Sequence, residues 1–193
     1  MSPARLLAAL GLAAALAACT SPDPALFTLA PASGAVRTGG AKVVLLQQVA
    51  IAHYLERREI VRSSENYRLA VMSNDWWGEP LGAMLSRVLV EELGQRLPQS
   101  TVIAENGAIS ARPDATLELN IERLDEDAAG NLILQAQVAV RFTGQASPVL
   151  RSFRFSVPPP APGVPGEVAA VSAAVGRLAD GIAPMVAVGG AAG

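Results

Sequence analysis

The sequence has very few of the residues on which metal binding, disulfide formation and catalysis usually depend. Among its 193 residues there is one histidine, His53, and one cysteine, Cys19. Zinc sites draw on several Cys and His ligands, so a zinc site of the usual type is excluded, and one cysteine cannot form a disulfide within the chain. The sequence also has no glycine-rich phosphate loop and no Gly-x-Ser-x-Gly nucleophile elbow. We therefore expect no metal, no cofactor and no enzymatic activity, and we interpret His53 as a surface or loop residue.

An excess of positive charge is missing as well. Lys and Arg number 15 against 17 Asp and Glu, which gives a formal net charge of −2 at pH 7. Because nucleic-acid-binding domains need a clearly basic surface, nucleic acid is excluded as a partner. The acidic residues Asp125, Glu126 and Asp127 lack the remainder of a calcium-binding loop, and we interpret them as a solvated turn.

The one cysteine stands at the end of a short apolar N-terminal run. Arg5 precedes the run, and residues 6–18 carry neither a charge nor a polar side chain. The run is shorter than the about 20 apolar residues that a membrane-spanning helix needs, and its basic start and small final residues are typical of a secretory signal. Its end, Leu16-Ala17-Ala18-Cys19, looks like a bacterial lipobox. In a lipobox the cysteine thiol receives a diacylglycerol, and the chain is then cut just before that cysteine.

We accordingly predict that residues 1–18 are a signal peptide that is removed, and that Cys19 carries a diacylglycerol and an acyl chain. Several acyl chains anchor a protein stably, whereas a single chain is marginal. Thr20 follows the cysteine, in place of the Asp that retains lipoproteins at the inner membrane of enteric-type bacteria. The expected location is therefore the outer membrane, with the protein lipid-anchored and facing the periplasm. The alternative is an ordinary signal peptide with an incidental cysteine.

The remaining roughly 175 residues suit one domain with a substantial hydrophobic core. Residues 19–24 are predicted to form a lipidated tether, because they are rich in Ser and Pro. Residues 25–188 are predicted to form a single α/β (α+β) domain, and residues 189–193 a disordered tail.

Periodicity within the domain predicts a sheet with two packed helices. Apolar and polar residues alternate over 115–124, 132–143 and 152–157, which predicts an antiparallel meander with one buried face. Apolar stripes along Pro80–Leu97 and along 164–182 predict the two helices. We therefore expect a mostly antiparallel sheet that both helices cover.

Shorter elements are expected around this framework. Asn74 to Leu81 is predicted to begin the first helix, with Asp75 as its cap. Further strands are predicted at residues 25–29, 42–51, 60–62, 65–71 and 100–104.

Aromatic and arginine residues gather between residues 54 and 77, and Tyr67 lies among them. Such residues are enriched at binding interfaces. We expect one of the two tryptophans to pack into the core, and the other to be available to a partner or to lipid. The alternative is that the whole segment fixes loops onto the domain. The residues predicted to contact a partner are Tyr54, Arg57, Arg58, Trp76 and Trp77.

Several of these stretches, taken in order, resemble one family. They are the lipobox, Phe27-Thr28-Leu29, the strand from Val43 to Ile51, Tyr54-Leu55-Glu56-Arg57 with Ile60-Val61-Arg62, and Trp77-Gly78-Glu79-Pro80-Leu81. Together they are similar to the PqiC-like lipoproteins, the ABC-type transport auxiliary lipoprotein family. The similarity covers nearly all of the mature chain, and its most specific part runs from Tyr54 to Leu81. In that family the tryptophan that corresponds to Trp77 opens the first helix.

The resemblance implies a role in lipid traffic. It implies a non-enzymatic outer-membrane lipoprotein subunit of an MCE-type intermembrane phospholipid transport system, supporting membrane integrity. The implied partners are a periplasmic MCE-domain protein and an inner-membrane permease. A conduit built of repeated subunits would favour a homo-oligomeric ring of this chain too. The alternative function is a structural or assembly lipoprotein of another outer-membrane complex.

Overall fold

The computed structural model describes residues 23–189. The predicted signal peptide, Cys19 and residues 190–193 of the predicted tail lie outside the described residues. The elements follow one another as β1 (Ala25–Phe27), β2 (Val43–Leu46), β3 (Ala50–Ile51), η2 (His53–Leu55), β4 (Glu59–Ser63), η3 (Glu65–Tyr67), β5 (Ala70–Trp77), α2 (Leu81–Arg96), β6 (Thr101–Ala104), β7 (Ala115–Glu126), β8 (Leu132–Phe142), β9 (Val149–Val157) and α3 (Val164–Gly189).

All the strands belong to one nine-stranded sheet with the long strand β7 at its centre. Along one edge β7 pairs with β8, and β8 with β9, both antiparallel. Along its other edge it pairs in succession with β2, β3 and β4, all parallel. Beyond β2 lies the parallel strand β6, while beyond β4 lie the antiparallel strand β5 and then β1. The prediction of a single α/β domain is confirmed, and the sheet is mixed.

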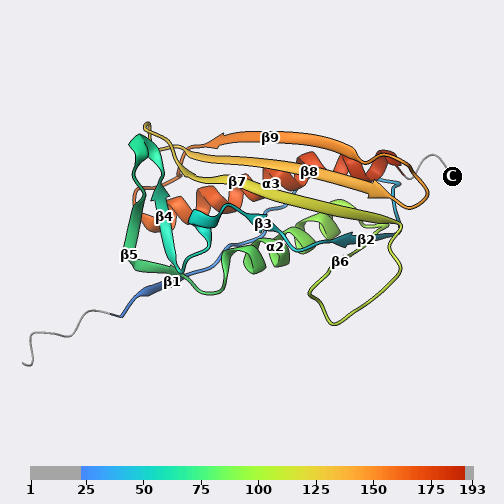
Figure 1. Ribbon diagram of the computed structural model, residues 1–193, viewed down its shortest axis with the longest axis horizontal. Helices are drawn as coiled ribbons and strands as arrows, with labels where there is room; N and C mark the ends of the chain where they lie inside the picture. The colour runs from blue at the N-terminus through green and yellow to red at the C-terminus, as the bar shows by residue number, and fades with distance from the viewer. Residues whose placement is uncertain (1–22, 190–193) are drawn as a thin grey trace, which may run out of the picture.

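Both helices cover the same face of this sheet, so the domain has two layers (Figure 1). The predicted stripe of α2 lies in the core, where Leu85, Leu89 and Leu93 have no exposed surface. Alternate residues of the meander point to the helices, as predicted, and the residues between them face away. The open face therefore carries polar side chains such as Glu118 and Gln137.

An irregularity in β7 changes which side chains face the helices. The pairing with β8 shifts register between Ile121 and Arg123. One extra residue in a strand reverses the alternation beyond it. Leu124 therefore shares the helix-covered face with Ile121, and Asp125 turns to the opposite face.

The predicted start of the first helix is wrong. Asn74 to Trp77 belong to β5, and Asp75 pairs with Ala25 of β1 instead of capping a helix. Helix α2 begins at Leu81, after Pro80. Residues 74–77 are extended because β1, about fifty residues earlier in the chain, supplies backbone hydrogen-bond partners to β5. The helix starts after Pro80 because proline has no N–H and suits the first positions of a helix.

Two of the predicted strands are also interrupted. Residues 65–71 do not form one strand, because Asn66 and Tyr67 have positive φ angles of 55° and 61° and make a turn. Residues 42–51 divide into β2 and β3, with Gln47 and Gln48 between them. The other predicted strands are found, with small differences at their ends.

The segment of residues 28–41 forms a strap that runs from β1 at one end of the molecule to β2 at the other (Figure 1). Its backbone is held by side chains and backbone atoms of α2. The N–H of Ala32 donates to Oε1 of Glu92 at 2.7 Å, and the N–H of Arg37 donates to the carbonyl of Arg96 at 2.7 Å. The strap is thus a fixed part of the helix layer.

Helix α3 is the one helix in residues 23–189 that is long and apolar enough to cross a membrane. More than half of its apolar window, 56%, is buried inside the protein. Leu178 and Ile182 have no exposed surface, and the helix packs on β8, β9 and α2. Its apolar character is therefore that of a core helix.

Candidate functional site

The predicted contact segment forms one end of the molecule, the hairpin of β4 and β5 with the turn η2 before it (Figure 1). This hairpin end is joined to the rest of the sheet lightly. The pairing of β4 with β5 has two register shifts, and β4 meets β7 through the single pair Ser63 and Glu126. The described chain also begins at this end, because β1 pairs with β5.

Tyr54 fixes η2 onto the sheet. Its hydroxyl donates to Oδ2 of Asp125 at 2.7 Å, and Nε of Arg123 donates to Oδ1 of the same carboxylate at 2.8 Å. Burial and the neighbouring carboxylate raise the pKa of Tyr54, so its hydroxyl keeps its proton at neutral pH. Tyr54 is therefore occupied by a contact within the domain.

The predicted solvated turn at 125–127 is wrong for its first two residues. Asp125 and Glu126 are the last residues of β7, with 1% and 9% of their surface exposed. Only Asp127 opens the turn, where its carboxylate accepts the N–H groups of Ala129 and Asn131 at 2.9 Å each. Pattern alone could not place the first two, because their partners come from other elements.

Arg62 links three elements across this end. Its Nε donates to Oε2 of Glu126 at 3.3 Å, and its Nη2 lies 3.1 Å from Oε1 of Glu167 in the first turn of α3. The second contact is an ion pair without the alignment of a hydrogen bond. Burial and the nearby Glu126 raise the pKa of Glu167 to about 7. Arg62 therefore ties β4 to β7 and α3.

The two tryptophans differ in exposure. Trp77 is 7% exposed and belongs to the core, and its backbone N–H donates to the carbonyl of Arg58 at 2.7 Å. Trp76 is half-buried, and its Nε1 donates to the carbonyl of Ser73 at 3.1 Å. Since Trp77 ends β5, it does not open the helix as the resemblance implied. Only Trp76 presents ring surface to solvent.

Arg57 and Arg58 are exposed, and neither takes part in an ion pair within residues 23–189. Nearby His53 has a side chain that is 98% exposed and pairs with Glu56 at 3.0 Å. That hydrogen bond and the charge of Glu56 raise the pKa of His53. Of the five predicted contact residues, the structure thus leaves Arg57, Arg58 and Trp76 accessible.

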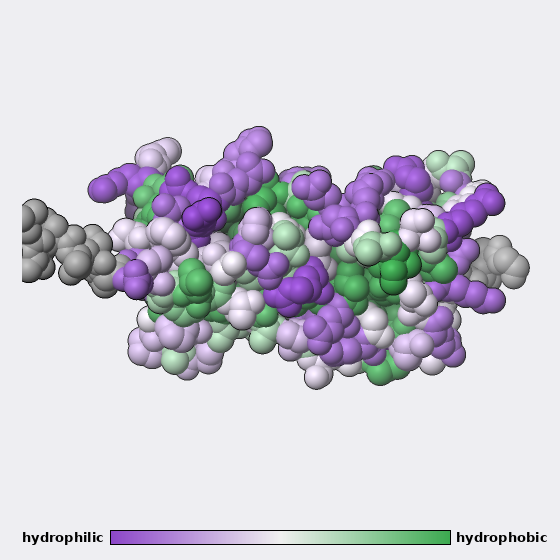
Figure 2. Space-filling view, turned by 90° about the horizontal axis from the view of Figure 1, so that it is seen from below, coloured by the Kyte–Doolittle hydropathy of each residue, from purple (hydrophilic) through white to green (hydrophobic). Residues whose placement is uncertain are grey.

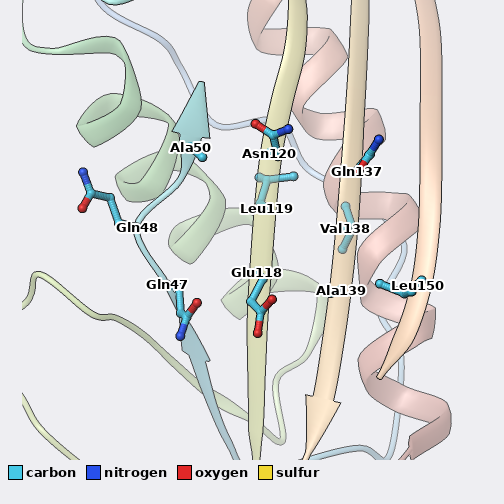
Figure 3. A pocket seen from close by; sticks show the side chains of 10 residues that line it. All are labelled: Gln47, Gln48, Ala50, Glu118, Leu119, Asn120, Gln137, Val138, Ala139 and Leu150. Atoms are coloured by element: carbon cyan, nitrogen blue, oxygen red, sulfur yellow. The ribbon is translucent and has the colours of Figure 1, made fainter. Parts of the chain in front are cut away.

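A groove that the sequence did not single out lies on the open face of the sheet (Figure 3). It encloses about 370 Å³ and is open to solvent. Polar side chains from neighbouring strands, among them Glu118, Asn120 and Gln137, surround it (Figure 3). Its lining holds no histidine, serine or cysteine. Within the described part of the chain, no three His, Cys, Asp or Glu side chains gather to hold a metal.

Comparison with known proteins gives three findings. Residues 27–183 match the family model described as "ABC-type transport auxiliary lipoprotein component". No curated protein matches the sequence. Solved structures match the whole fold, with low sequence identity.

One similar structure is a crystal structure of an uncharacterized protein, with a TM-score of 0.70 and 18% identity, covering 84% of this chain and 98% of that one. Another is protein XCC0632 from Xanthomonas campestris, of the family DUF330, with a TM-score of 0.69 and 14% identity, covering 86% of this chain and 95% of that one. A PelC dodecamer from Paraburkholderia phytofirmans is more distant, with a TM-score of 0.43, 11% identity and coverages of 81% and 94%. The first two show the fold alone, and the third carries no argument about assembly.

Proposed function

Because this chain belongs to the family of ABC-type transport auxiliary lipoprotein components, we propose that it is a non-enzymatic subunit of an intermembrane phospholipid transport system. The observation that carries the proposal is the extent of the family match, from residue 27 in β1 to residue 183 in α3. The match includes both the hairpin end and the helix-covered body, which is the part of the domain formed by α2, α3, β6, β7, β8 and β9. The subunit supports membrane integrity by helping the system move lipid, and it needs no chemistry of its own.

The subunit is anchored through Cys19, which carries a diacylglycerol and an acyl chain. The lipobox supports this anchor. Thr20, directly after the cysteine, supports an outer-membrane location facing the periplasm. Mass spectrometry of the mature protein should find the lipid on an N-terminal Cys19. Unchanged membrane retention of a Cys19→Ser variant would contradict the anchor.

The partner is a periplasmic MCE-domain protein that forms a conduit, and this subunit binds the end of that conduit at the outer membrane. An inner-membrane permease completes the system. Contact is made through Arg57, Arg58 and Trp76, which are accessible on the hairpin end. Tyr54 and Trp77 hold the shape of this surface from beneath, through Asp125 and the core. A ring of copies of this chain would match a conduit with repeated subunits.

The test is capture of the partner from membranes by the acylated protein, using the variants Trp76→Ala and Arg57→Ala. Arg154→Ala is the matched control, because Arg154 is also exposed but lies on β9, outside the hairpin. Lost capture with unchanged thermal melting supports the proposal. If melting collapses, or if capture survives both changes, the docking surface lies elsewhere. If no MCE-domain protein is captured even by the unaltered chain, the proposed system is wrong.

The absence of catalysis is tested at the one histidine. Among the hydrogen bonds of the described residues, the imidazole of His53 contacts only the side chain of Glu56. A His53→Ala variant should restore membrane integrity fully in a strain that lacks the gene. Loss of complementation with normal protein levels would favour an enzyme instead.

A further inference from the structure

The tip of the β4–β5 hairpin, residues 65–69, carries large side chains with apolar surface exposed to solvent. Tyr67 is 107% exposed, and Leu69 is 46% exposed. Between them lies Arg68, which is exposed and has no ion pair within residues 23–189. An aromatic, a cationic and an aliphatic residue thus follow one another at the tip, within residues 64–70, none of which is buried.

The tip is held in this conformation rather than frayed. Asn66 and Tyr67 have consecutive φ angles of 55° and 61°, in a region that non-glycine residues seldom adopt because of steric cost. Such conformations persist where surrounding contacts impose them. Here Nη2 of Arg123 donates to Oε1 of Glu65 at 2.7 Å, and the N–H of Arg68 donates to the carbonyl of Glu65 at 3.2 Å.

Ser63 adds a second fixing point at the base of the turn. Its Oγ accepts the N–H of Glu65 at 3.2 Å and donates to the carbonyl of Glu126 at 3.1 Å. The hairpin tip is therefore attached to the end of β7. The fold thus fixes the backbone at Tyr67 and leaves its side chain exposed.

The place of the tip relative to the chain start says what it meets. Strand β5 carries the tip and pairs with β1, with Ala25 opposite Asp75 (Figure 1). From Asp75 to Tyr67 the extended backbone spans at most about 25 Å. The six tether residues 19–24 reach at most about 20 Å from Ala25, which is less than this span. Because the hairpin and the start of the described chain lie at the same end of the molecule (Figure 1), a bilayer that faces this end, with β5 inclined along its surface, both holds the acyl chains of Cys19 and contacts the tip.

We propose that the hairpin tip is a second membrane contact, which rests on the proposed anchoring at Cys19. Tyr67 lies at the level of the lipid headgroups, where amphipathic aromatic rings are favoured. Leu69 enters the boundary with the acyl chains, and Arg68 lies beside the phosphates. The contact fixes how the domain stands on the membrane, because it adds a second point of attachment to the acyl chains of Cys19.

The face of the molecule drawn in Figure 2 shows apolar surface only as separate areas between hydrophilic ones. Ile109, which is 70% exposed, lies in the loop that projects beyond β6 at the other end of the molecule (Figure 1). It is as apolar and as accessible as the residues of the tip, but distant from the anchored end. Ile109 is therefore the matched control for a contact that depends on position rather than on apolarity.

The experiment measures the depth of the tip with a spin label. Since Cys19 is the only cysteine and is acylated, Tyr67→Cys supplies a single free thiol for a nitroxide, and Ile109→Cys supplies the control. The acylated full chain is placed on vesicles of phosphatidylethanolamine and phosphatidylglycerol. We expect collisions with a water-soluble nickel chelate to be about tenfold rarer at residue 67 than at residue 109, with oxygen collisions retained. Both labelled proteins should melt like the unlabelled chain.

Flotation of the same vesicles separates the two claims. Protein that floats while residue 67 stays as open to the nickel chelate as residue 109 overturns the tip contact and leaves the anchor standing. Protein that does not float overturns the anchor and the tip contact with it. Shielding of residue 67 that arises only after an MCE-domain protein is added would also overturn the proposal, because the tip would then be a protein contact.

Discussion

The helix-covered body and the hairpin end are held together in different ways. In the body, α3 packs on the long paired strands β8 and β9, α2 packs on α3 and β6, and residues such as Leu89 and Leu178 have no exposed surface. At the hairpin end, short pairings with register shifts are secured by polar side chains, above all Arg62 and Arg123. Apolar burial gives stability without direction, whereas polar ties fix positions. The body thus supplies stability, and the hairpin end supplies placed surface residues.

Two arginines make the comparison concrete. Arg96, in the body, has no exposed surface, and its Nε donates to Oδ1 of Asp180 at 2.7 Å. Its other nitrogens donate to the carbonyls of Ala32 and Gly176, at 2.9 Å and 3.0 Å. It therefore joins the strap to both helices. Arg62 makes a similar three-way link at the hairpin end, but its side chain is 52% exposed.

The largest effect is expected from Arg96→Met. It removes the donor of three carbonyls, those of Ala32, Glu92 and Gly176, and at about 1–3 kcal/mol for an unsatisfied buried group the loss should be about 3–5 kcal/mol. Asp180 adds little, because its side chain is 47% exposed. Arg62→Met should cost only about 1–2 kcal/mol, since water reaches half of that side chain. Urea unfolding of both variants measures the difference. Equal losses would remove the distinction between body and end.

The tryptophans sharpen the boundary between the two regions. Trp77→Ala should lower the free energy of unfolding by about 3 kcal/mol, because it empties a core position. Trp76→Ala should lower it by less than about 1.5 kcal/mol, since its half-buried ring leaves a smaller space. Thermal melting followed by far-UV circular dichroism compares them. A larger loss for Trp76→Ala than for Trp77→Ala would contradict the assignment of Trp77, and not Trp76, to the core.

The next effect depends on pH and arises in the body. Glu92 has no exposed surface, and burial, with Asp180 and Glu91 nearby, raises its pKa to about 7 against the opposing effect of Arg96. The folded state therefore binds a proton that the unfolded state releases above its ordinary pKa. The stability from this group is complete below the unfolded pKa and is lost as pH rises towards about 7.

Glu92→Gln should remove this loss, on the order of 2 kcal/mol between acid and neutral pH. Glu167, whose pKa burial and Glu126 also raise to about 7, should act in the same direction at the hairpin end. Urea midpoints of both glutamine variants across pH 4.5 to 8 measure each share. A stability that rises with pH in the unaltered protein and is unaffected by either change would contradict the assignment.

The smallest effect is expected at the hairpin tip, and it is a gain. Tyr67→Gly replaces a residue with φ of 61° by one that adopts this conformation without steric cost. The steric relief of about 1–2 kcal/mol exceeds the about 0.5–1 kcal/mol that glycine costs through the greater freedom of the unfolded chain, and the exposed ring loses no packing. The free energy of unfolding should therefore rise by about 0.5–1 kcal/mol. Differential scanning calorimetry against the unaltered chain would detect it. A fall in stability would show that Tyr67 is held by contacts within the domain.

The sequence predicted the body well and the hairpin end poorly, for a physical reason. The stripe from Leu81 to Leu97 and the alternation of residues 115–157 are local periodicities, and burial of one face is all that they require. At the hairpin end the decisive partners are remote. Asp75 looked like a helix cap, but it pairs with Ala25, fifty residues earlier.

The buried polar residues show the same limit. The sequence around Asp125 and Glu126 is that of a solvated turn, but in the fold Tyr54 donates a hydrogen bond to Asp125 and Arg62 donates one to Glu126. The strap of residues 28–41 has no hydrophobic periodicity from which its position could be predicted. Its backbone is held by hydrogen bonds to Glu92 and Arg96 of α2. For the candidate surface, enrichment in Trp, Tyr and Arg indicated the segment, but only the fold separated the accessible Arg57, Arg58 and Trp76 from the buried Trp77.

The most direct test of the account is photocrosslinking in living cells from a reactive amino acid placed at Arg58, with the same group at Arg154 for comparison. Both positions are exposed arginines, one on the hairpin end and one on the body. We expect Arg58 to give an adduct with a periplasmic MCE-domain protein, and Arg154 to give none. An adduct from Arg154 alone, or none with such a protein from either site, would contradict the claim that the hairpin end is where this subunit meets its partner.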